Sequence, residues 1–493
     1  MTAVFVVLTL QALMGAFDNL WHHELSARLP QRVSARHELR LHAMREALYG
    51  FLFLTFAWVR WDGAWVALPS LLLMIEIGIT AADFLEEDRS RRLPGFERVL
   101  HTLLAVSYGL LVGLLVPLFR DQALLPTGLT RVDHGAWSWF FTLAGAGVLA
   151  WSLRNALAVR HLRAVEQGNR SPIAMPTGPA VLVTGGTGFI GQALVRQLIR
   201  TGRRVIVLSR DAMQARATFG PNVWVVERLS DVPHETRVEA IVNLAGATVL
   251  GMPWTRRRRQ QLVDSRVQTT RQVLNLIHRL GERPKVMVTA SAVGFYGTPG
   301  FEQVLTEDSP ARPGQFQSDL CGAIEAESGR ARALGLRVVN LRLGIVLGHG
   351  GGAYPLQALA ARWGLGAILG TGRQPAPWIH LDDALGLIRL ALTHGPLSGP
   401  VNAVAPQALT QAEFAQALAD SFGRRARLAM PAWPLRLLLG EMSELLLSGQ
   451  RVEPTRALGH GYVFRHAGIR TALADLAQPP LPAAQHPRAN KLA

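Results

Sequence analysis

Residues 181–191 read Val181-Leu-Val-Thr-Gly-Gly-Thr-Gly-Phe-Ile-Gly191, and this stretch decides the fold. An apolar run from Ala180 to Val183 leads into the glycines, and a helical pattern follows from Phe189 to Ile199. A second apolar run, Arg204 to Leu208, completes a β-α-β unit. The glycines permit a tight turn, close approach of a pyrophosphate and close packing of the helix on the strand. The sequence therefore predicts an α/β fold with a Rossmann-like, doubly wound parallel sheet.

The turn after the first strand and the start of the following helix supply the expected phosphate contacts. Free N–H groups and the positive end of the helix dipole favour an anion at this position. A glycine-rich turn in an unliganded sheet has the same pattern, but the strand-helix-strand order favours a dinucleotide. The residues expected to contact the cofactor here are Gly185, Gly188, Phe189, Ile190 and Gly191.

The end of the second strand indicates which dinucleotide binds. A carboxylate at this point binds the ribose 2′-hydroxyl of NAD, whereas an arginine accommodates the 2′-phosphate of NADP. Here Ser209 and Arg210 end the strand and favour NADP, while Asp211 is the competing candidate for NAD. A third apolar strand, Ala240 to Gly246, ends in Asn243, Ala245 and Gly246, small residues suited to lie beside the adenosine.

Composition limits the other function classes. The chain has 493 residues, which is enough for two or three domains, and one cysteine, Cys321, which excludes an internal disulfide framework. The net charge of +16 is carried almost entirely by arginine, because Lys285 and Lys491 are the only lysines. These arginines are scattered along the chain and no nucleic-acid-binding motif is present, so we expect no nucleic-acid partner.

Five apolar segments precede the glycine motif, and several approach the roughly 20 residues that span a bilayer. They cover residues 2–20, 46–60, 64–83, 99–119 and 136–155. The segment at 46–60 is short and also fits a buried core helix. We expect an all-α transmembrane domain of five spans in the inner (plasma) membrane.

Arginine placement predicts the orientation of these spans. Arginines cluster in the loop after the first segment, in the loop after the third and after the fifth: Arg28, Arg32, Arg36, Arg40, Arg45; Arg89, Arg91, Arg92, Arg98; Arg154, Arg160, Arg163. The alternate loops hold only Arg60, Arg120 and Arg131. The positive-inside rule then puts the N-terminus outside and the dinucleotide domain in the cytoplasm.

Acidic and histidine residues also occur in the membrane half. Glu76 lies within an apolar run, where a carboxylate is often functional. Others gather around the first basic loop: Asp18, His22, His23, His37, Glu38, His42 and Glu46. A metal or quinone site is one interpretation. We favour the other, interfacial histidines and salt bridges on amphipathic helix ends, and assign no metal ligand.

The expected domain layout follows from these segments. It comprises a transmembrane domain at 1–165, a linker at 166–178, the dinucleotide-binding domain at 179–395, a C-terminal substrate-side lobe at 396–477 and a disordered tail at 478–493. The lobe begins with a capping box at Thr410 and Glu413 and continues with a helical apolar pattern from Trp433 to Leu447.

From residue 180 to about 475 the chain resembles the extended short-chain dehydrogenase/reductase superfamily, and within it the atypical epimerase-like branch with a C-terminal domain of unknown function. The matching stretches, in the expected order, are Thr184-Gly-Gly-Thr-Gly-Phe-Ile-Gly191, Asn243-Leu-Ala-Gly246, Trp254-Thr255, Ser265-Arg266, Ser291-Ala-Val-Gly-Phe-Tyr-Gly297, Leu341-Arg-Leu-Gly344, Trp378-Ile-His-Leu-Asp-Asp383 and Leu437-Leu-Leu-Gly-Glu-Met442. The resemblance leaves residues 1–165 unexplained.

The resemblance implies hydride transfer assisted by a Tyr-x-x-x-Lys pair and a nearby Ser or Thr. This sequence lacks the pair, and Gln317 and Cys321 occupy the corresponding positions when counted back from Glu325. The candidate catalytic residues are therefore Ser291, Tyr296 and Cys321. Tyr296 is equally suited to shape its loop, and Cys321 to inert packing. For His380 we favour capping of the helix that begins near Asp382 over catalysis.

Two functions from different classes fit these patterns. One is a membrane-anchored, NADP-dependent, epimerase-like oxidoreductase acting on a small-molecule or lipid-associated substrate. The other is a catalytically silent NADPH sensor coupled to a membrane partner, which the missing pair favours. A transporter with a regulatory domain rests only on Glu76 and the apolar spans. Neither the substrate nor the oligomeric state follows from the sequence.

Overall fold

The computed structural model describes residues 1–493 apart from 28, 32–34, 91–94, 169–177, 252 and 479–493. The chain divides into two compact units, Met1–Pro172 and Ile173–Ala493, which are described separately. This division falls inside the stretch that the sequence analysis assigned to the linker. The expected linker residues 169–177 and the expected tail from 479 onward lie outside the described residues.

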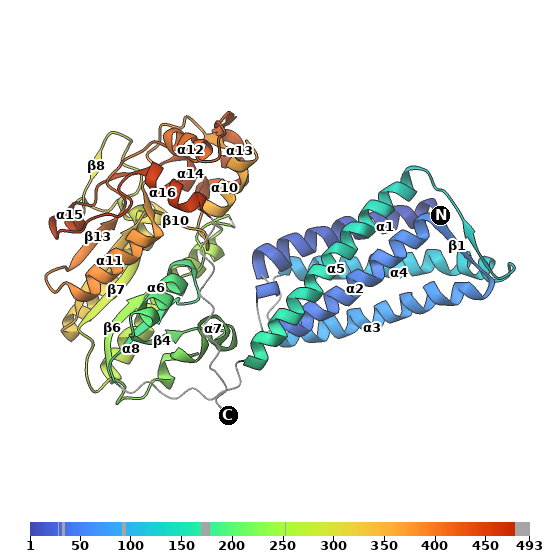
Figure 1. The fold of residues 1–493 in the computed structure, drawn as a ribbon, viewed down its shortest axis with the longest axis horizontal. Helices are drawn as coiled ribbons and strands as arrows, with labels where there is room; N and C mark the ends of the chain where they lie inside the picture. Colours follow the sequence, from blue (N-terminus) through green and yellow to red (C-terminus); the bar gives the residue numbers. More distant parts are fainter. Residues whose placement is uncertain (28, 32–34, 91–94, 169–177, 252, 479–493) are drawn as a thin grey trace, which may run out of the picture. The chain divides into compact units, whose positions relative to one another are not determined.

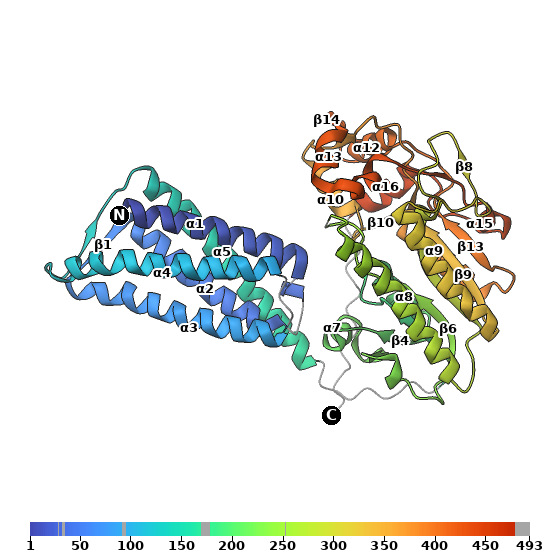
Figure 2. The same cartoon turned by 180° about the vertical axis from the view of Figure 1, so that it is seen from behind.

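Five long helices form the described part of the first unit (Figures 1 and 2). A π-helical segment, η1, extends the first helix, and two short strands pair antiparallel. The elements are α1 (Thr2–Asp18), η1 (Asn19–Ala27), α2 (Arg36–Trp58), β1 (Val59–Asp62), α3 (Ala67–Ser90), α4 (Gly95–Ala123), β2 (Gly128–Arg131) and α5 (Ala136–Gly168). Aromatic and aliphatic side chains from these helices form one buried core that includes Phe5, Phe53, Leu111 and Phe141.

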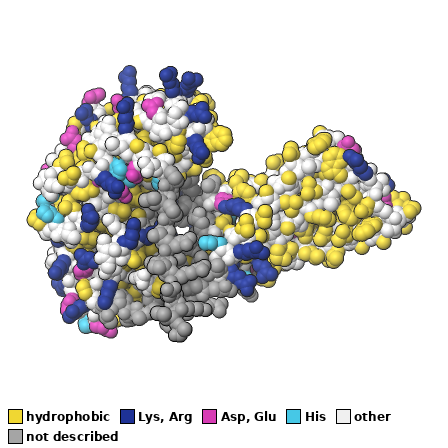
Figure 3. All heavy atoms as spheres, viewed as in Figure 1, with side chains coloured by type: hydrophobic (Ala, Val, Ile, Leu, Met, Phe, Trp, Pro, Cys, Tyr) yellow, Lys and Arg dark blue, Asp and Glu magenta, His cyan; other side chains and the backbone are white. Residues whose placement is uncertain are grey.

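Four of these helical segments are long and apolar enough to cross a membrane, judged by length and composition over the described residues. They are Thr2–Glu24, Gly63–Glu87, Gly95–Ala123 and Ala136–Arg163. Four of the five expected spans meet this criterion, and the segment at 46–60 does not. The predicted segment 46–60 belongs to α2, which starts earlier, at Arg36, and whose first half carries charged and histidine residues. The other helices expose many large apolar side chains, which Figure 3 shows along the bundle surface.

The acidic and histidine residues of this unit are mostly buried. Asp18, Glu38 and His42 each expose 2% or less of their surface, and His22, His23, Glu46 and Glu76 are also buried, whereas His37 is exposed. The expected salt bridges are present, for example between Asp18 and His22, but these groups lie buried inside the bundle. Their helices turn these side chains toward one another inside the bundle rather than toward a solvent boundary.

A seven-stranded parallel sheet forms the centre of the second unit and confirms the Rossmann-like prediction. The strand order is β13-β9-β7-β6-β3-β4-β5, with β3 (Ala180–Thr184), β4 (Arg204–Leu208), β5 (Val223–Val226), β6 (Val238–Asn243), β7 (Val286–Ala292), β9 (Arg337–Leu343) and β13 (Gly399–Ala403). Because helices cover both faces, the strands read as continuous apolar runs rather than alternating ones.

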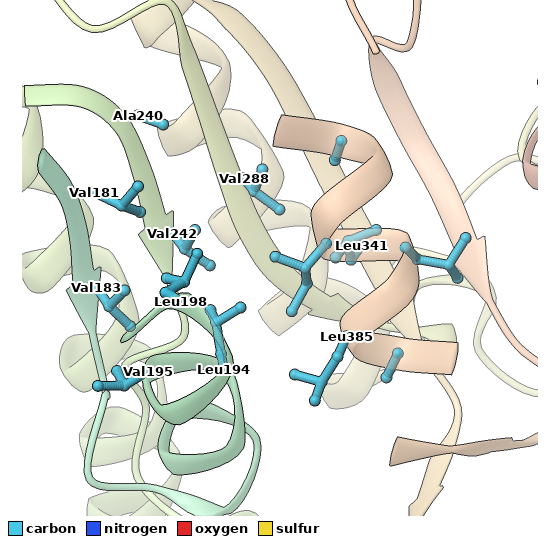
Figure 4. Close-up of a cluster of buried hydrophobic side chains, with 14 of the residues drawn as sticks. Val181, Val183, Leu194, Val195, Leu198, Ala240, Val242, Val288, Leu341 and Leu385 are labelled. Carbon is cyan, nitrogen blue, oxygen red and sulfur yellow. The ribbon is translucent and has the colours of Figure 1, made fainter. Parts of the chain in front are cut away.

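Two apolar layers hold the helices on this sheet. On one face Val181 and Val183 pack with Leu194 and Leu198 of α6 (Phe189–Arg200) and with Leu385 of α11 (Leu381–Thr393), as Figure 4 shows. On the opposite face, the alternate strand residues pack against α8 (Arg256–Arg279), including Val273 and Ile277. Buried apolar side chains cover both faces of the sheet. The strand register therefore decides which residues point into which of the two layers.

The C-terminal lobe differs from its predicted limits. β13 pairs with β9, so the main sheet continues past residue 395. The lobe also takes in earlier segments, because Leu347 and Tyr354 pack with Phe414 and Leu473.

The predicted helix from Trp433 to Leu447 is broken: α13 (Ala432–Leu439) stops at Gly440, whose φ of +55° is left-handed, and α14 covers only Glu444–Leu447. The capping box of α12 (Gln411–Asp420) is confirmed.

Candidate functional site

The loops after β3 and β6 lie side by side, because these two strands are neighbours in the sheet. The chain order reverses direction here: β4 follows outward on one side and β6, β7 and β9 on the other. In open α/β sheets, ligands bind at this switch point, outside the carboxyl ends of the strands. The fold thus brings the predicted cofactor residues of both loops to one place.

The glycine turn is shaped by close backbone packing. Gly185 has a φ of +67°, and a Cβ on it would lie 2.7 Å from the carbonyl carbon of Leu244. A Cβ on Gly191 would lie 2.1 Å from the carbonyl oxygen of Gly185. Neither position accepts a side chain. Gly188 is exposed and is the N-cap of α6, so the first N–H groups of that helix, from Phe189 to Gly191, stay available to an anion.

A second glycine-rich loop covers the start of this helix. The half-buried ring of Phe189 lies close to the backbone of residues 348–352, which read Gly-His-Gly-Gly-Gly. A Cβ on Gly348 would lie 2.8 Å from this ring, and one on Gly352 would lie 2.8 Å from the carbonyl oxygen of Val346. Ile190 points the other way and packs against the sheet core. Phe189 therefore connects two glycine loops, and Ile190 anchors the helix.

The end of β4 separates the two candidates for recognition of the adenosine ribose. The Asp211 carboxylate accepts the Gln214 N–H at 2.8 Å and caps α7 (Ala212–Phe219). The buried Ser209 hydroxyl donates to the Asp211 carbonyl at 2.9 Å and fixes the turn. Arg210 is exposed. The Arg210 side chain is thus exposed, while the Asp211 carboxylate caps helix α7.

Buried side chains support the loop after β6 through hydrogen bonds. Asn243 is buried: its oxygen accepts from the Thr184 hydroxyl at 2.5 Å and its amide donates to the Thr270 hydroxyl at 2.9 Å. The Thr184 hydroxyl also accepts the Ala245 N–H at 3.3 Å. A Cβ on Gly246 would lie 2.7 Å from the Arg266 guanidinium, so a side chain here would require Arg266 to shift. Asn243 therefore positions the loop, whereas Ala245 and Gly246 form its surface.

The helix that would carry a Tyr-x-x-x-Lys pair is α9 (Phe316–Gly329), as predicted. Gln317 and Cys321 are both buried, beneath Gly294 of the loop after β7. Burial raises the pKa of the Cys321 thiol to about 11, although a backbone hydrogen bond from Ala292 partly offsets this. Cys321 is therefore protonated at neutral pH and packed in the interior, which favours inert packing, while its role as a weak acid stays a prediction.

Ser291 and Tyr296 belong to one buried polar network. The Ser291 hydroxyl donates to Glu325 Oε1 at 2.8 Å, and Arg342 donates to both oxygens of Glu325 at 2.9 Å. Arg342 also donates to the Tyr296 hydroxyl at 2.8 Å, and that hydroxyl donates to Asn402 Oδ1 at 2.6 Å. Burial raises the pKa of Tyr296, with Arg342 acting in the opposite direction.

These contacts distinguish the two catalytic candidates, Ser291 and Tyr296. Tyr296 is fully buried and its hydroxyl is engaged on both sides, which favours the structural interpretation over the catalytic one. Ser291 stands at the carboxyl end of β7 and keeps lone pairs on its oxygen beyond the bond to Glu325. Of the three candidates, Ser291 is the one at a strand end, and its side chain is also buried.

His380 acts as the sequence analysis favoured. It is the N-cap of α11, and its Nδ1 accepts the Asp382 N–H at 3.2 Å. Burial and the neighbouring His466 lower the pKa of His380. The neutral ring is the form that can accept this hydrogen bond, so the cap and the pKa shift agree.

Sequence reasoning missed Glu325 and Arg342 as a unit. They lie 17 residues apart, on α9 and β9, and only the folded chain joins them. The glycine run at residues 348–352 was also missed, although its composition is visible in the sequence.

The C-terminal lobe adds Met442, which packs with Leu320 and Ile324 of α9. Part of the lobe therefore packs on α9, and its substrate-side role stays a prediction.

Comparison with known proteins shows which family the second unit resembles. Residues 181–403 match the NAD dependent epimerase/dehydratase family, and residues 430–476 match a domain of unknown function, DUF1731. The epimerase family protein YfhF of Bacillus subtilis (strain 168) is 38% identical over 303 residues, which are 60% of this chain and 97% of that protein. The epimerase family protein SDR39U1 of Mus musculus is 36% identical over 60% of this chain and 99% of its own length.

A solved structure agrees with this placement. The crystal structure of human epimerase family protein SDR39U1 (isoform 2) with NADPH is 34% identical in sequence and has a TM-score of 0.55. It covers 60% of this chain and 99% of the human chain. The NADP-type cofactor expected from the sequence agrees with the NADPH present in that human structure. The relatives named here match the second unit, and the family matches begin at residue 181.

Proposed function

This chain belongs to the epimerase family of NAD(P)-dependent proteins, and we propose that it is a membrane-anchored, NADP-dependent oxidoreductase of the epimerase type. The observation that carries the cofactor choice is the end of β4. Arg210 is exposed beside the expected ribose position, and Asp211 is engaged as a helix cap. A 2′-phosphate gains a charge-assisted hydrogen bond from this arginine, whereas a ribose 2′-hydroxyl lacks a free carboxylate.

The residues present fit such a cofactor. Gly185 and Gly191 exclude side chains where the pyrophosphate approaches, and the N–H groups at the start of α6 face that position. The nicotinamide, when bound, supplies or accepts a hydride. Ser291 would orient the substrate by hydrogen bonding to its carbonyl or hydroxyl oxygen, and Glu325, paired with Arg342, would hold Ser291 in place.

The membrane half supports an anchored enzyme with a small or lipid-associated substrate. Four helical segments have the length and composition of spans. The C-terminal lobe also exposes Trp433, Leu437 and Leu438 on one short helix, each with at least 68% of its surface accessible. Exposed apolar side chains in one group suit contact with lipid or with a lipid-like substrate. The arginine distribution favours the inner (plasma) membrane with the second unit in the cytoplasm.

A second candidate function is a catalytically silent NADPH sensor coupled to a membrane partner. The specific observation in its favour is that Gln317 and Cys321 occupy the positions of the proton-transferring pair and are buried. In this case the protein binds NADPH and changes its contacts with a partner, but no hydride leaves the cofactor.

Turnover separates the two functions. Purified full-length protein in detergent is incubated with NADPH or NADP and fractionated aqueous or lipid extracts, and absorbance at the reduced nicotinamide band is followed. Gly191→Val serves as the control, because it cannot form the turn. Turnover that the control lacks supports the oxidoreductase. NADPH binding without turnover in any fraction favours the sensor, and absence of NADPH binding contradicts both.

A further inference from the structure

We propose that the buried carboxylate and histidine side chains of the first unit form a binding site for one or two divalent first-row transition-metal ions. Two sets of four residues each bring their ligand atoms within 4.8 Å of one another, and every member is buried. The first set is Asp18, His23, Glu97 and His101, and the second is His23, Glu38, His42 and Glu87. This site is separate from the dinucleotide site and does not depend on the proposed function.

The two sets repeat one arrangement. Glu38 and His42 lie four residues apart on α2, and Glu97 and His101 lie four residues apart on α4. Side chains at this spacing share a helix face. Helix bundles that bind metals through carboxylates use the same principle, in which glutamates and histidines from several helices project inward. The repeated pair makes each set a chelating unit rather than a chance meeting of charges.

Other helices complete the sets. Asp18 at the end of α1 joins the pair on α4, and Glu87 near the end of α3 joins the pair on α2. His23 in the π-helical segment η1 belongs to both. Short π-helical segments recur at functional sites because they redirect side chains. Five elements of the bundle thus direct donors to one region.

The geometry around His101 indicates a cation. Its Nε2 makes a hydrogen bond of 3.2 Å with Asp18 Oδ2, and an ionised carboxylate can only accept, so Nε2 carries that proton. In the neutral ring, Nδ1 then presents a lone pair. This atom lies 3.2 Å from Glu87 Oε2 and is buried. A proton on Nδ1 or a metal ion bound to it would each satisfy this contact, and measuring the metal content of the protein separates the two.

Neighbouring amides orient the shared histidine. His23 Nδ1 lies 3.0 Å from Asn19 Oδ1, while the Asn19 amide donates to Glu46 at 3.0 Å, so Asn19 Oδ1 is the acceptor. His23 Nδ1 therefore carries the proton and directs the Nε2 lone pair toward the cluster. Glu46 is held in turn by two hydrogen bonds from the Asn155 amide. Metal-binding histidines depend on such outer partners for their tautomer and orientation.

The types of donor atom limit which metal ions suit the site. Both sets offer only imidazole nitrogen and carboxylate oxygen, and the single cysteine, Cys321, belongs to the other unit. Such donors suit iron, manganese, cobalt or zinc in the divalent state, whereas a site for Cu(I) uses sulfur. The expected ligand is therefore a divalent ion of this group rather than a soft metal.

Metal content of the full-length protein is the primary test. The protein is expressed with a tag that lacks histidines, purified in detergent, and analysed by elemental mass spectrometry before and after treatment with a chelator. We expect about one to two equivalents of iron, manganese or zinc per chain, and restoration of the metal on addition of the ion alone. Co(II) should give the absorption bands of a nitrogen- and oxygen-bound ion. Metal below a tenth of an equivalent, with no uptake of added ion, overturns the proposal.

Paired variants on one helix locate the site. His42→Ala removes a buried ligand from α2, and His37→Ala removes an exposed histidine from the same helix. We expect His42→Ala to lower metal affinity at least tenfold and His37→Ala to leave it unchanged. Glu97→Gln keeps the shape of the side chain and should also lower affinity, while NADPH binding by the second unit stays intact. Equal metal content in all three variants overturns the assignment to these residues, whatever NADPH does.

Discussion

The Ser291 hydroxyl is joined to the Glu325 carboxylate by a hydrogen bond of 2.8 Å. This contact links the end of β7 to α9, the helix in which the usual proton-transferring pair is missing. Glu325 also forms a buried ion pair with Arg342, whose side chain is 4% exposed. Ser291 is thus positioned by a charge pair that the sequence alone did not connect.

Removing the charge of Glu325 should destabilise the protein strongly. Glu325→Gln leaves the buried Arg342 cation without its partner, and breaking a buried pair in this way costs about 3–5 kcal/mol. The free energy of unfolding is measured by denaturant titration of the full-length protein. Glu441→Gln is the control, because its ion pair with Arg259 is largely exposed and should contribute less than about 1 kcal/mol. Equal losses in the two variants would contradict a special role for the buried pair.

Tyr296→Phe tests whether this tyrosine is structural. The variant loses the hydrogen bonds with Arg342 and Asn402, so we expect a loss of about 1–3 kcal/mol in unfolding free energy. NADPH affinity and any turnover, measured below the unfolding midpoint, should remain unchanged. A variant with normal stability but lost turnover would show instead that the hydroxyl reaches the substrate.

Arg210→Ala should reduce discrimination between the two cofactors. The 2′-phosphate loses a charge-assisted hydrogen bond, so NADPH should bind about 10- to 100-fold more weakly while NADH binding is unchanged. Affinities are measured by fluorescence of the bound reduced cofactor. Asp211→Asn is the control, since asparagine also caps helices and the cap is the role assigned to Asp211. Improved NADPH binding in that control would mean that the aspartate faces the ribose.

Cys321 should be chemically inert in the folded protein. Burial raises the pKa of its thiol to about 11, so the reactive thiolate forms only as the pH approaches that value and is scarce at neutral pH. Mass spectrometry after iodoacetamide treatment at pH 7 and in denaturant tests this, and labelling is expected only in denaturant. Cys321→Ser should retain NADPH binding. Rapid labelling of the native protein at pH 7 would contradict the buried, neutral assignment.

Local patterns predicted the sheet and the glycine turn because both depend on neighbours in sequence. The helix starting at Phe189 follows from a strand, a glycine turn and a 3.6-residue period within about twenty positions. Arg210 follows from its position at a strand end. These features need no knowledge of which distant segments meet.

The parts that sequence reasoning missed depend on distant contacts. Glu325 and Arg342 are ordinary charged residues until α9 packs against β9. The burial of the histidine cluster was missed for the same reason: amphipathic spacing shows that Glu38 and His42 share a face, but not whether that face meets solvent or other helices. The break at Gly440 was missed because apolar periodicity continues across a residue whose backbone is left-handed.

The orientation of the first unit in the membrane can be argued from its helix ends. β1 directly follows α2, β2 follows α4 after the short segment 124–127, and the two strands pair, so these helices end at the same end of the bundle. The start of α1 lies there as well, because the rings of Phe5 and His134 are 4.8 Å apart. The helix ends that carry Arg36, Arg98 and Arg160 then fall at the opposite end. Whether or not α2 contacts lipid, the chain alternates between the two ends.

That alternation gives the last prediction. In a Cys321→Ser background, single cysteines replace Leu124, which is 82% exposed between α4 and β2, or Val463, which is 87% exposed in the second unit. Because the positive-inside rule puts the arginine-rich end in the cytoplasm, an impermeant maleimide added to intact cells should label Leu124→Cys. Val463→Cys should react only after the membrane is permeabilised, which also serves as its control. Reaction at position 463 in intact cells would place the dinucleotide site outside the cytoplasm. NADPH is supplied in the cytoplasm, so that outcome would remove the basis for an NADP-dependent function as well as the proposed orientation.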